Sequence, residues 1–91
     1  MTLDKVFTKH DDGAHGWLEV TYDDLIDLNI QSKISNFSYI DSNKKLIYLE
    51  EDCDMTLFMK SYKEKYKKGI TYVIDNNFEI HPIRDLSTYI N

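Results

Sequence analysis

The sequence predicts an α+β fold: a two-layer domain with a mostly antiparallel sheet of four to six strands, one short helix and one long helix. The run LIYL at 46–49 is apolar at every position, which is typical of a central strand covered on both faces. Other β-branched and aromatic segments are joined by short turns, so we expect antiparallel hairpins. The long helix is indicated by apolar residues at the spacing of one buried helical face: Met55, Phe58, Met59, Tyr62 and Tyr66.

Length and composition indicate one folded domain over residues 1–91. A chain of 91 residues can bury a modest core, and a hydrophobic content of 42% excludes a disordered chain. The single cysteine excludes an internal disulfide, and the first residues form no apolar leader, so we expect a cytoplasmic protein. No apolar run approaches the roughly 18 to 20 residues that span a membrane, so we expect no membrane association.

The first two strands are predicted at 3–9 and 15–20, with a polar turn at 10–14 between them. Trp17 in the second strand is the largest hydrophobic residue of the chain. We therefore expect Trp17 to anchor the core.

The short helix is predicted to begin after Thr21 and to end near Asn29. Thr21 and Asp24 have the spacing of a capping box, in which each side chain accepts a hydrogen bond from the backbone N–H of the other residue. The connection at 30–35 carries Ile34, which we expect to fill the core.

A hairpin is predicted from strands at 37–40 and 45–50, and the long helix follows it. Asp52 or Asp54 is expected to cap the first turn of this helix, because a carboxylate there can accept a hydrogen bond from an unpaired backbone N–H. Gly69 is expected to end the helix in the left-handed conformation.

The C-terminal segment is predicted to add strands at 70–74 and 78–81, with a turn at Asn76 and Asn77 between them. Pro82 cannot donate a hydrogen bond to a sheet, so it ends the second of these strands. In the tail we expect a helical turn that places three apolar residues on one side: Ile83, Leu86 and Ile90.

The charge of the chain is unevenly distributed. The formal net charge is −5; residues 1–55 carry five Lys and twelve Asp or Glu, whereas residues 56–91 carry six Lys or Arg and four Asp or Glu. Proteins that bind duplex DNA usually carry the opposite balance, so we expect no direct binding to nucleic acid. An acidic surface suits a basic protein partner.

Two groups of side chains have the chemistry of metal ligands. The first group lies in the turn after the first strand: His10, Asp11, Asp12 and His15. The second group lies between the central strand and the long helix: Glu50, Glu51, Asp52 and Asp54. A polar turn explains the first group more simply, and helix capping explains the second, so we predict no metal and no cofactor.

Two further features have a functional and a structural interpretation. Cys53 could act as a nucleophile near a helix N-terminus, but no base is apparent nearby in the sequence, so a small buried residue is the better interpretation. The lysines of the long helix with Tyr62 and Tyr66 could bind single-stranded nucleic acid. Both tyrosines fall on the predicted buried stripe, which favours a solvated lysine face: Lys60, Lys63, Lys65, Lys67 and Lys68.

Three segments carry a resemblance to known proteins: HGWLEV at 15–20, the residues KIS and SY between 33 and 39, and YLEEDCD at 48–54. This pattern, within about residues 7–60, resembles a group of small uncharacterised proteins of phages, plasmids and other mobile elements. The resemblance implies a setting that is rich in inhibitors of host defence, such as anti-CRISPR and anti-restriction proteins. It implies no catalytic residues.

The leading hypothesis is a small acidic, non-catalytic binding protein of a phage or mobile element. It would inhibit a host defence enzyme that acts on nucleic acid by occupying a basic groove of that enzyme in the host cytoplasm. The predicted partner-binding residues are acidic: Asp23, Asp24, Asp27, Glu50, Glu51 and Asp52. The alternatives are a metal-dependent hydrolase or nuclease that uses His10, Asp12, His15 and the acids of 50–54, and an accessory domain that works as an oligomer.

Overall fold

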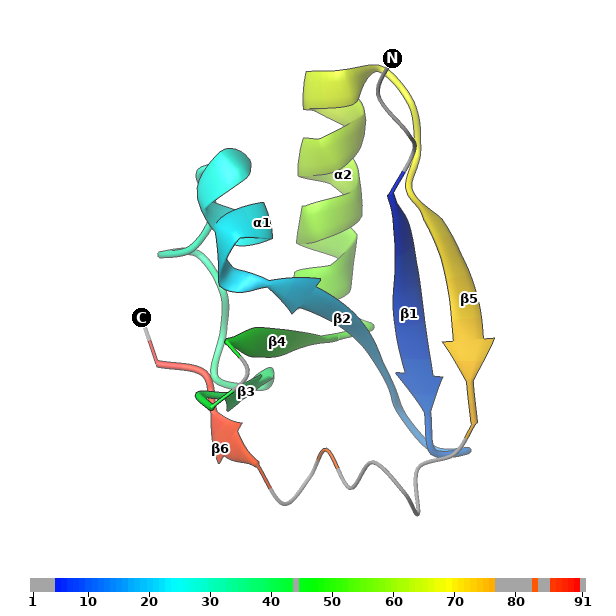
Figure 1. The fold of residues 1–91 in the computed structure, drawn as a ribbon, viewed down its shortest axis with the longest axis vertical. Helices are drawn as coiled ribbons and strands as arrows, with labels where there is room; N and C mark the ends of the chain where they lie inside the picture. Colours follow the sequence, from blue (N-terminus) through cyan, green and yellow to red (C-terminus); the bar gives the residue numbers. More distant parts are fainter. Residues whose placement is uncertain (1–4, 44, 77–82, 84–85, 91) are drawn as a thin grey trace.

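The computed structural model describes residues 5–43, 45–76, 83 and 86–90 (Figure 1). These residues form a six-stranded sheet with the order β5-β1-β2-β4-β3-β6. Every neighbouring pair is antiparallel except β1 and β5, which are parallel. The predicted α+β fold is therefore confirmed. The elements are β1 (Val6–Asp11), β2 (Gly16–Thr21), α1 (Tyr22–Asp27), β3 (Tyr39–Asp41), β4 (Leu46–Glu50), α2 (Asp54–Tyr66), β5 (Thr71–Asp75) and β6 (Ser87–Thr88).

The main core lies between the sheet and the two helices. β4 is buried on both faces, as predicted: Ile47 and Leu49 belong to the main core, and Tyr48 faces the opposite side of the sheet. Leu25 of α1 and Phe58 of α2 pack into the main core, so both helices cover the same face. β2 pairs with β1 and β4, and β4 also pairs with β3, so β2 and β4 lie at the centre of the sheet.

A second, smaller apolar cluster covers the other face of the sheet. Trp17 is only 4% exposed, so it is an anchor as predicted, but it packs with Tyr48 and Ile83 rather than with the helices. Alternation along β2 explains this, because Leu18 and Val20 point to the helix face and Trp17 points away from it.

The start of α1 follows the predicted capping box. The Oγ1 of Thr21 accepts a hydrogen bond from the N–H of Asp24 at 3.1 Å, and the Asp24 carboxylate accepts one from the N–H of Thr21 at 2.8 Å. In the connection after α1, Ile34 is 1% exposed and fills the main core, as predicted.

The start of α2 differs from the prediction. Cys53 is the N-cap residue and makes no side-chain capping hydrogen bond, so neither Asp52 nor Asp54 caps the helix. Asp54 is instead 2% exposed, and its carboxylate accepts hydrogen bonds from the N–H of Ser35 at 3.1 Å and from the hydroxyls of Ser35 and Ser38 at 2.6 and 2.5 Å. Tertiary hydrogen bonds have replaced the local cap.

The end of α2 also differs from the prediction. The left-handed residue is Lys67, with φ 62°, and its N–H donates a hydrogen bond to the carbonyl of Lys63. Gly69 lies outside the left-handed region, so it does not end the helix.

The C-terminal part of the chain forms both edges of the sheet. β5 is close to the predicted strand at 70–74, and Figure 1 shows it beside β1 at one edge. The predicted strand at 78–81 lies outside the described residues. In the tail, Ile83 and Leu86 lie on one side as predicted, and the N–H of Leu86 donates to the carbonyl of Ile83 at 3.0 Å, as in a helical turn. The prediction is wrong only beyond this turn, because Ser87 and Thr88 form β6 against β3 and Ile90 is 84% exposed.

Tyr89 holds the end of the chain against the main core. Its N–H donates to the carbonyl of Ser38 at 2.8 Å, and its hydroxyl donates to the carbonyl of Gln31 at 2.5 Å. These bonds require an extended backbone after Leu86, where the prediction continued the helical turn.

Among the described residues, no helix has the length and apolar character to cross a membrane.

Candidate functional site

The six acidic residues predicted to bind a partner fall into two groups. Asp23, Asp24 and Asp27 lie on α1, which follows β2, whereas the acids at 50–52 lie at the end of β4 and in the turn after it. In the β2–β4 register, Thr21 is opposite Leu46 and Trp17 is opposite Glu50. The two groups therefore lie at opposite ends of this strand pair, about 13 Å apart at the rise of a strand. The structure does not bring the six carboxylates together at one point.

Three of the six carboxylates form ion pairs within the chain. Asp24 lies 2.7 Å from the Nζ of Lys5, and Glu51 lies 2.9 Å from the Nζ of Lys9. The hydrogen bond from Lys9 to Glu51 raises the pKa of the Lys9 ammonium group above its usual value.

Asp27 joins the end of α1 to the end of α2. Its carboxylate accepts hydrogen bonds from the Nζ of Lys65 at 2.6 Å and from the hydroxyl of Tyr66. The bond from Lys65, followed by the bond from Tyr66, lowers the pKa of Asp27 below its usual value. Asp24, Asp27 and Glu51 therefore contribute less negative potential to the surface than their number indicates.

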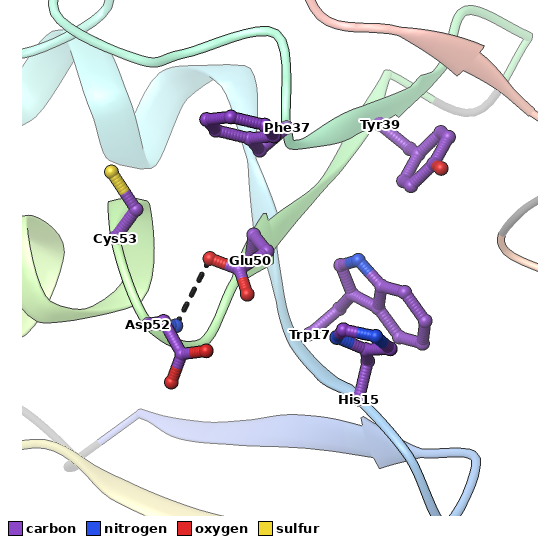
Figure 2. Close-up of a pocket in the computed structure, with 7 residues that line it drawn as sticks. All are labelled: His15, Trp17, Phe37, Tyr39, Glu50, Asp52 and Cys53. Atoms are coloured by element: carbon purple, nitrogen blue, oxygen red, sulfur yellow. Dashed lines mark hydrogen bonds between the residues drawn. The ribbon is translucent and has the colours of Figure 1, made fainter.

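Glu50 and Asp52 line a pocket at the β4–α2 turn, and Figure 2 shows them among aromatic side chains. The cavity has a volume of about 410 Å³. We call it the aromatic–acidic pocket. It is lined by His15, Trp17, Phe37, Tyr39, Glu50, Asp52 and Cys53.

The sheet register assembles the aromatic wall of this pocket. Trp17 lies across from Glu50 on the neighbouring strand, and Tyr39 of β3 lies one strand beyond β4. The rings of Trp17 and Tyr39 are 6.2 Å apart between centroids and nearly perpendicular, and the ring of His15 lies 6.2 Å from that of Trp17. Phe37 is 67% exposed, so one wall of the pocket is an aromatic ring open to solvent.

The buried carboxylate of Asp54 helps to position the acidic wall. The hydroxyl of Ser38 donates a hydrogen bond to the carboxylate of Asp54 and accepts one from the N–H of Glu50 at 3.0 Å. The Glu50 carboxylate in turn accepts the N–H of Asp52 at 3.0 Å, the bond drawn in Figure 2. The carboxylate of Glu50 is therefore held in place by the backbone of the turn.

The pocket was not predicted from the sequence. Trp17 was interpreted only as a core residue, and Cys53 was predicted to be buried, whereas its side chain is exposed and lines the pocket. Alternation along β2 does place His15 and Trp17 on one face, which is a signal in the sequence. Their pairing with Glu50 and Tyr39 depends on the register, which no local pattern specifies.

The residues of the metal-site alternative do not converge. His10 is 6% exposed, and its Nε2 lies 3.0 Å from the carboxylate of Glu19 on β2. Asp12 accepts hydrogen bonds from the N–H groups of Ala14 and His15, as expected for a polar turn. Within the described part of the chain, no three His, Cys, Asp or Glu residues are placed to hold a metal ion.

The tyrosines of the lysine face are engaged within the molecule. Tyr62 packs against the main core, and its ring lies 4.7 Å from that of Tyr66. Tyr66 binds Asp27 through its hydroxyl. Tyr66 is 42% exposed, so its predicted place on the buried stripe is wrong, whereas Tyr62 is partly buried as part of the helix face that meets the core. The engagement of Tyr62 with the core and of Tyr66 with Asp27 favours the interpretation of a solvated lysine face.

No protein-family model matches this chain, and neither the curated proteins nor the solved structures include a match.

Proposed function

We propose that the chain is a non-catalytic binding protein that places its acidic surface in a basic groove of an enzyme that acts on nucleic acid. The observation that supports this proposal is the aromatic–acidic pocket, where the carboxylates of Glu50 and Asp52 stand beside aromatic side chains. Aromatic residues are enriched in protein interfaces, and acidic groups complement a surface that has evolved to hold phosphates.

Glu50 and Asp52 are the acids best suited to meet a basic partner. Within the residues that the structure describes, neither forms an ion pair, whereas Asp24, Asp27 and Glu51 do. Asp23 on α1 is also exposed, and it borders a separate cavity near Lys45. We therefore propose that the β4–α2 turn is the centre of the binding surface.

The resemblance of about residues 7–60 to small proteins of mobile elements supports the proposed biological setting. In that setting we propose that the partner is a host defence enzyme and that the chain acts as an anti-CRISPR or anti-restriction inhibitor. The net charge of −5 supports rapid association with a basic groove at low salt.

The proposal is tested by affinity capture from a bacterial lysate at low and high salt, with mass spectrometry to identify the captured proteins. We expect one stoichiometric nucleic-acid enzyme that is released by high salt, because exposed charges are screened there. The double variant Glu50→Lys/Asp52→Lys should lose this partner, and Asp23→Lys, an equally exposed acid at the other end of the β2–β4 pair, should retain it. Equal capture by both variants would contradict the proposed surface.

A further inference from the structure

We propose that the aromatic–acidic pocket binds the guanidinium group of one arginine side chain. This inference rests on the proposed function, because it names the chemical group through which a basic partner is held. A pocket of about 410 Å³ is at the lower end of the size range of ligand sites, and it can receive a single long side chain.

The charge of the pocket favours a cation. Glu50 and Asp52 contribute two negative charges, and none of the described residues that line the pocket is a lysine or an arginine. The N-terminus of α2 is also close, but a helix end carries only about half a positive charge. The exposed ring of Phe37 adds further attraction, since the π-electron face of an aromatic ring is negative.

The geometry favours arginine over other cations. A guanidinium is planar, so it can stack on an aromatic ring while its N–H groups donate to a carboxylate. Phe37, which is 67% exposed, supplies such a ring, and Glu50 lines the same pocket. A trimethylated ammonium has no N–H, so it would leave the carboxylates without a hydrogen-bond donor.

The pocket is organised before a ligand arrives. Trp17 is buried, and the backbone of Glu50 is fixed to Ser38, which is itself held by Asp54. Fixed groups lose little conformational entropy on binding, so a single side chain can contribute strongly to affinity. These features are typical of an interface hot spot, where arginine is one of the enriched residues.

The chain carries its own reporters for a direct test. Trp17 is the one tryptophan and Cys53 the one cysteine of the sequence, and both line the pocket. The peptide Ac-Gly-Arg-Gly-NH2 should change the Trp17 fluorescence saturably and should slow the alkylation of Cys53 at least roughly threefold at saturation. The peptide with citrulline, a neutral isostere of arginine, should do neither, and the lysine peptide should bind at least about threefold more weakly.

Variants separate the pocket from general effects of charge. Glu50→Gln should weaken binding of the arginine peptide about tenfold or more, because it removes the charged acceptor. Phe37→Ala and Asp52→Asn change exposed side chains, so both should fold normally and weaken binding about threefold or more. Asp23→Asn removes one charge far from the pocket and should bind as the wild type does.

Three results would overturn the inference: equal binding of the citrulline peptide, equal binding of the lysine peptide, or displacement of the arginine peptide by inorganic phosphate but not by chloride of equal ionic strength. The partner capture described above is independent of this titration. Arginine binding without a captured partner would support the pocket and contradict the inhibitor proposal. Capture that depends on Glu50 and Asp52, without binding of the arginine peptide, would support the inhibitor proposal and contradict the arginine pocket.

Discussion

Asp54 joins three segments of the chain through a single buried carboxylate. Its carboxylate accepts hydrogen bonds from Ser35 and Ser38 in the connection that precedes β3. The hydroxyl of Ser38 also accepts a hydrogen bond from the backbone N–H of Glu50 in β4. A buried charge is costly unless it is hydrogen-bonded, so these donors compensate for the burial of Asp54. The same bonds hold the pocket wall in place.

Replacing this carboxylate should destabilise the fold strongly. Asp54→Ala leaves the donors of Ser35 and Ser38 without their acceptor, and we expect the free energy of unfolding to fall by roughly 3 kcal/mol in urea denaturation. Asp52→Ala is the matched control, since Asp52 is exposed in the same turn and should change stability by less than about 0.5 kcal/mol. Similar losses for the two variants would show that Asp54 has no special role.

Tyr48 should make the fold sensitive to alkaline pH. Burial, together with the charges of Glu19 and Asp41 and a hydrogen bond with Glu19, raises the pKa of Tyr48 to about 12. An unfolded tyrosine has a pKa of about 10, so the neutral phenol stabilises the fold below about pH 10, and this contribution is lost as the pH rises toward 12. Tyr48→Phe keeps the ring and removes the titration.

The measurement is the free energy of unfolding at several pH values between about 9 and about 11.5. We expect it to fall more steeply in the wild type than in Tyr48→Phe over this range. Titrations of the other tyrosines occur in both proteins and cancel in the comparison. Parallel pH profiles would contradict the raised pKa.

At the scale of elements, the observed backbone differs from the sequence-based prediction at the end of α2. Lys67 adopts the left-handed conformation, which is strained for a residue with a β-carbon, and Gly69 does not adopt it. We expect Lys67→Gly to raise the free energy of unfolding by about 0.5–1 kcal/mol, as measured by urea denaturation.

Gly69→Ala is the companion variant. A β-carbon at Gly69 would meet no atom within 4 Å, so alanine should be neutral or slightly stabilising. If Gly69 were the left-handed residue, as first expected from the sequence, the same alanine would be destabilising. The two variants together identify which residue ends the helix.

Elements whose signals are local were predictable, and elements fixed by tertiary contacts were not. The capping box of Thr21 needs only residues three positions apart, and the burial of β4 follows from its own apolar run. Asp54 accepts hydrogen bonds from Ser35 and Ser38, which are far away in the sequence. It therefore does not form the expected helix cap. The turn at Ile83 and Leu86 was predictable, but the tail after it was not, because Tyr89 binds distant carbonyl groups instead of continuing a helix.

The same distinction applies to the candidate site. The acidic character of 50–52 is evident in the sequence, but the aromatic wall is assembled by three neighbouring strands and their connections. Trp17 meets Glu50 only because the β2–β4 register makes them partners. The ion pairs that neutralise Asp24, Asp27 and Glu51 also join distant parts of the chain, so sequence alone gave all six acids equal weight.

At the scale of the whole molecule, the parallel pairing of β1 with β5 joins distant parts of the chain. Val6 is the register partner of Thr71, so this pair closes the longest loop of the sheet, and such contacts carry a large entropy cost. β5 also exposes Val73 and Ile74, which are 56% and 57% exposed. We expect the amides of β5 to exchange with solvent through an opening of lower free energy than those of β2 and β4, as measured by native-state hydrogen exchange. Equal protection of all three strands would show that the sheet opens as one unit.

The position of β5 at the edge of the sheet has a consequence for the pocket. Among the residues that the structure describes, the pocket lining falls within 15–53, and none of it belongs to β1 or β5. The described lining of the pocket thus comes from one stretch of the sequence, whereas the β1–β5 pair joins segments that lie before and after that stretch. Loosening the β1–β5 pair should therefore lower the stability of the folded chain while leaving the geometry of the pocket unchanged.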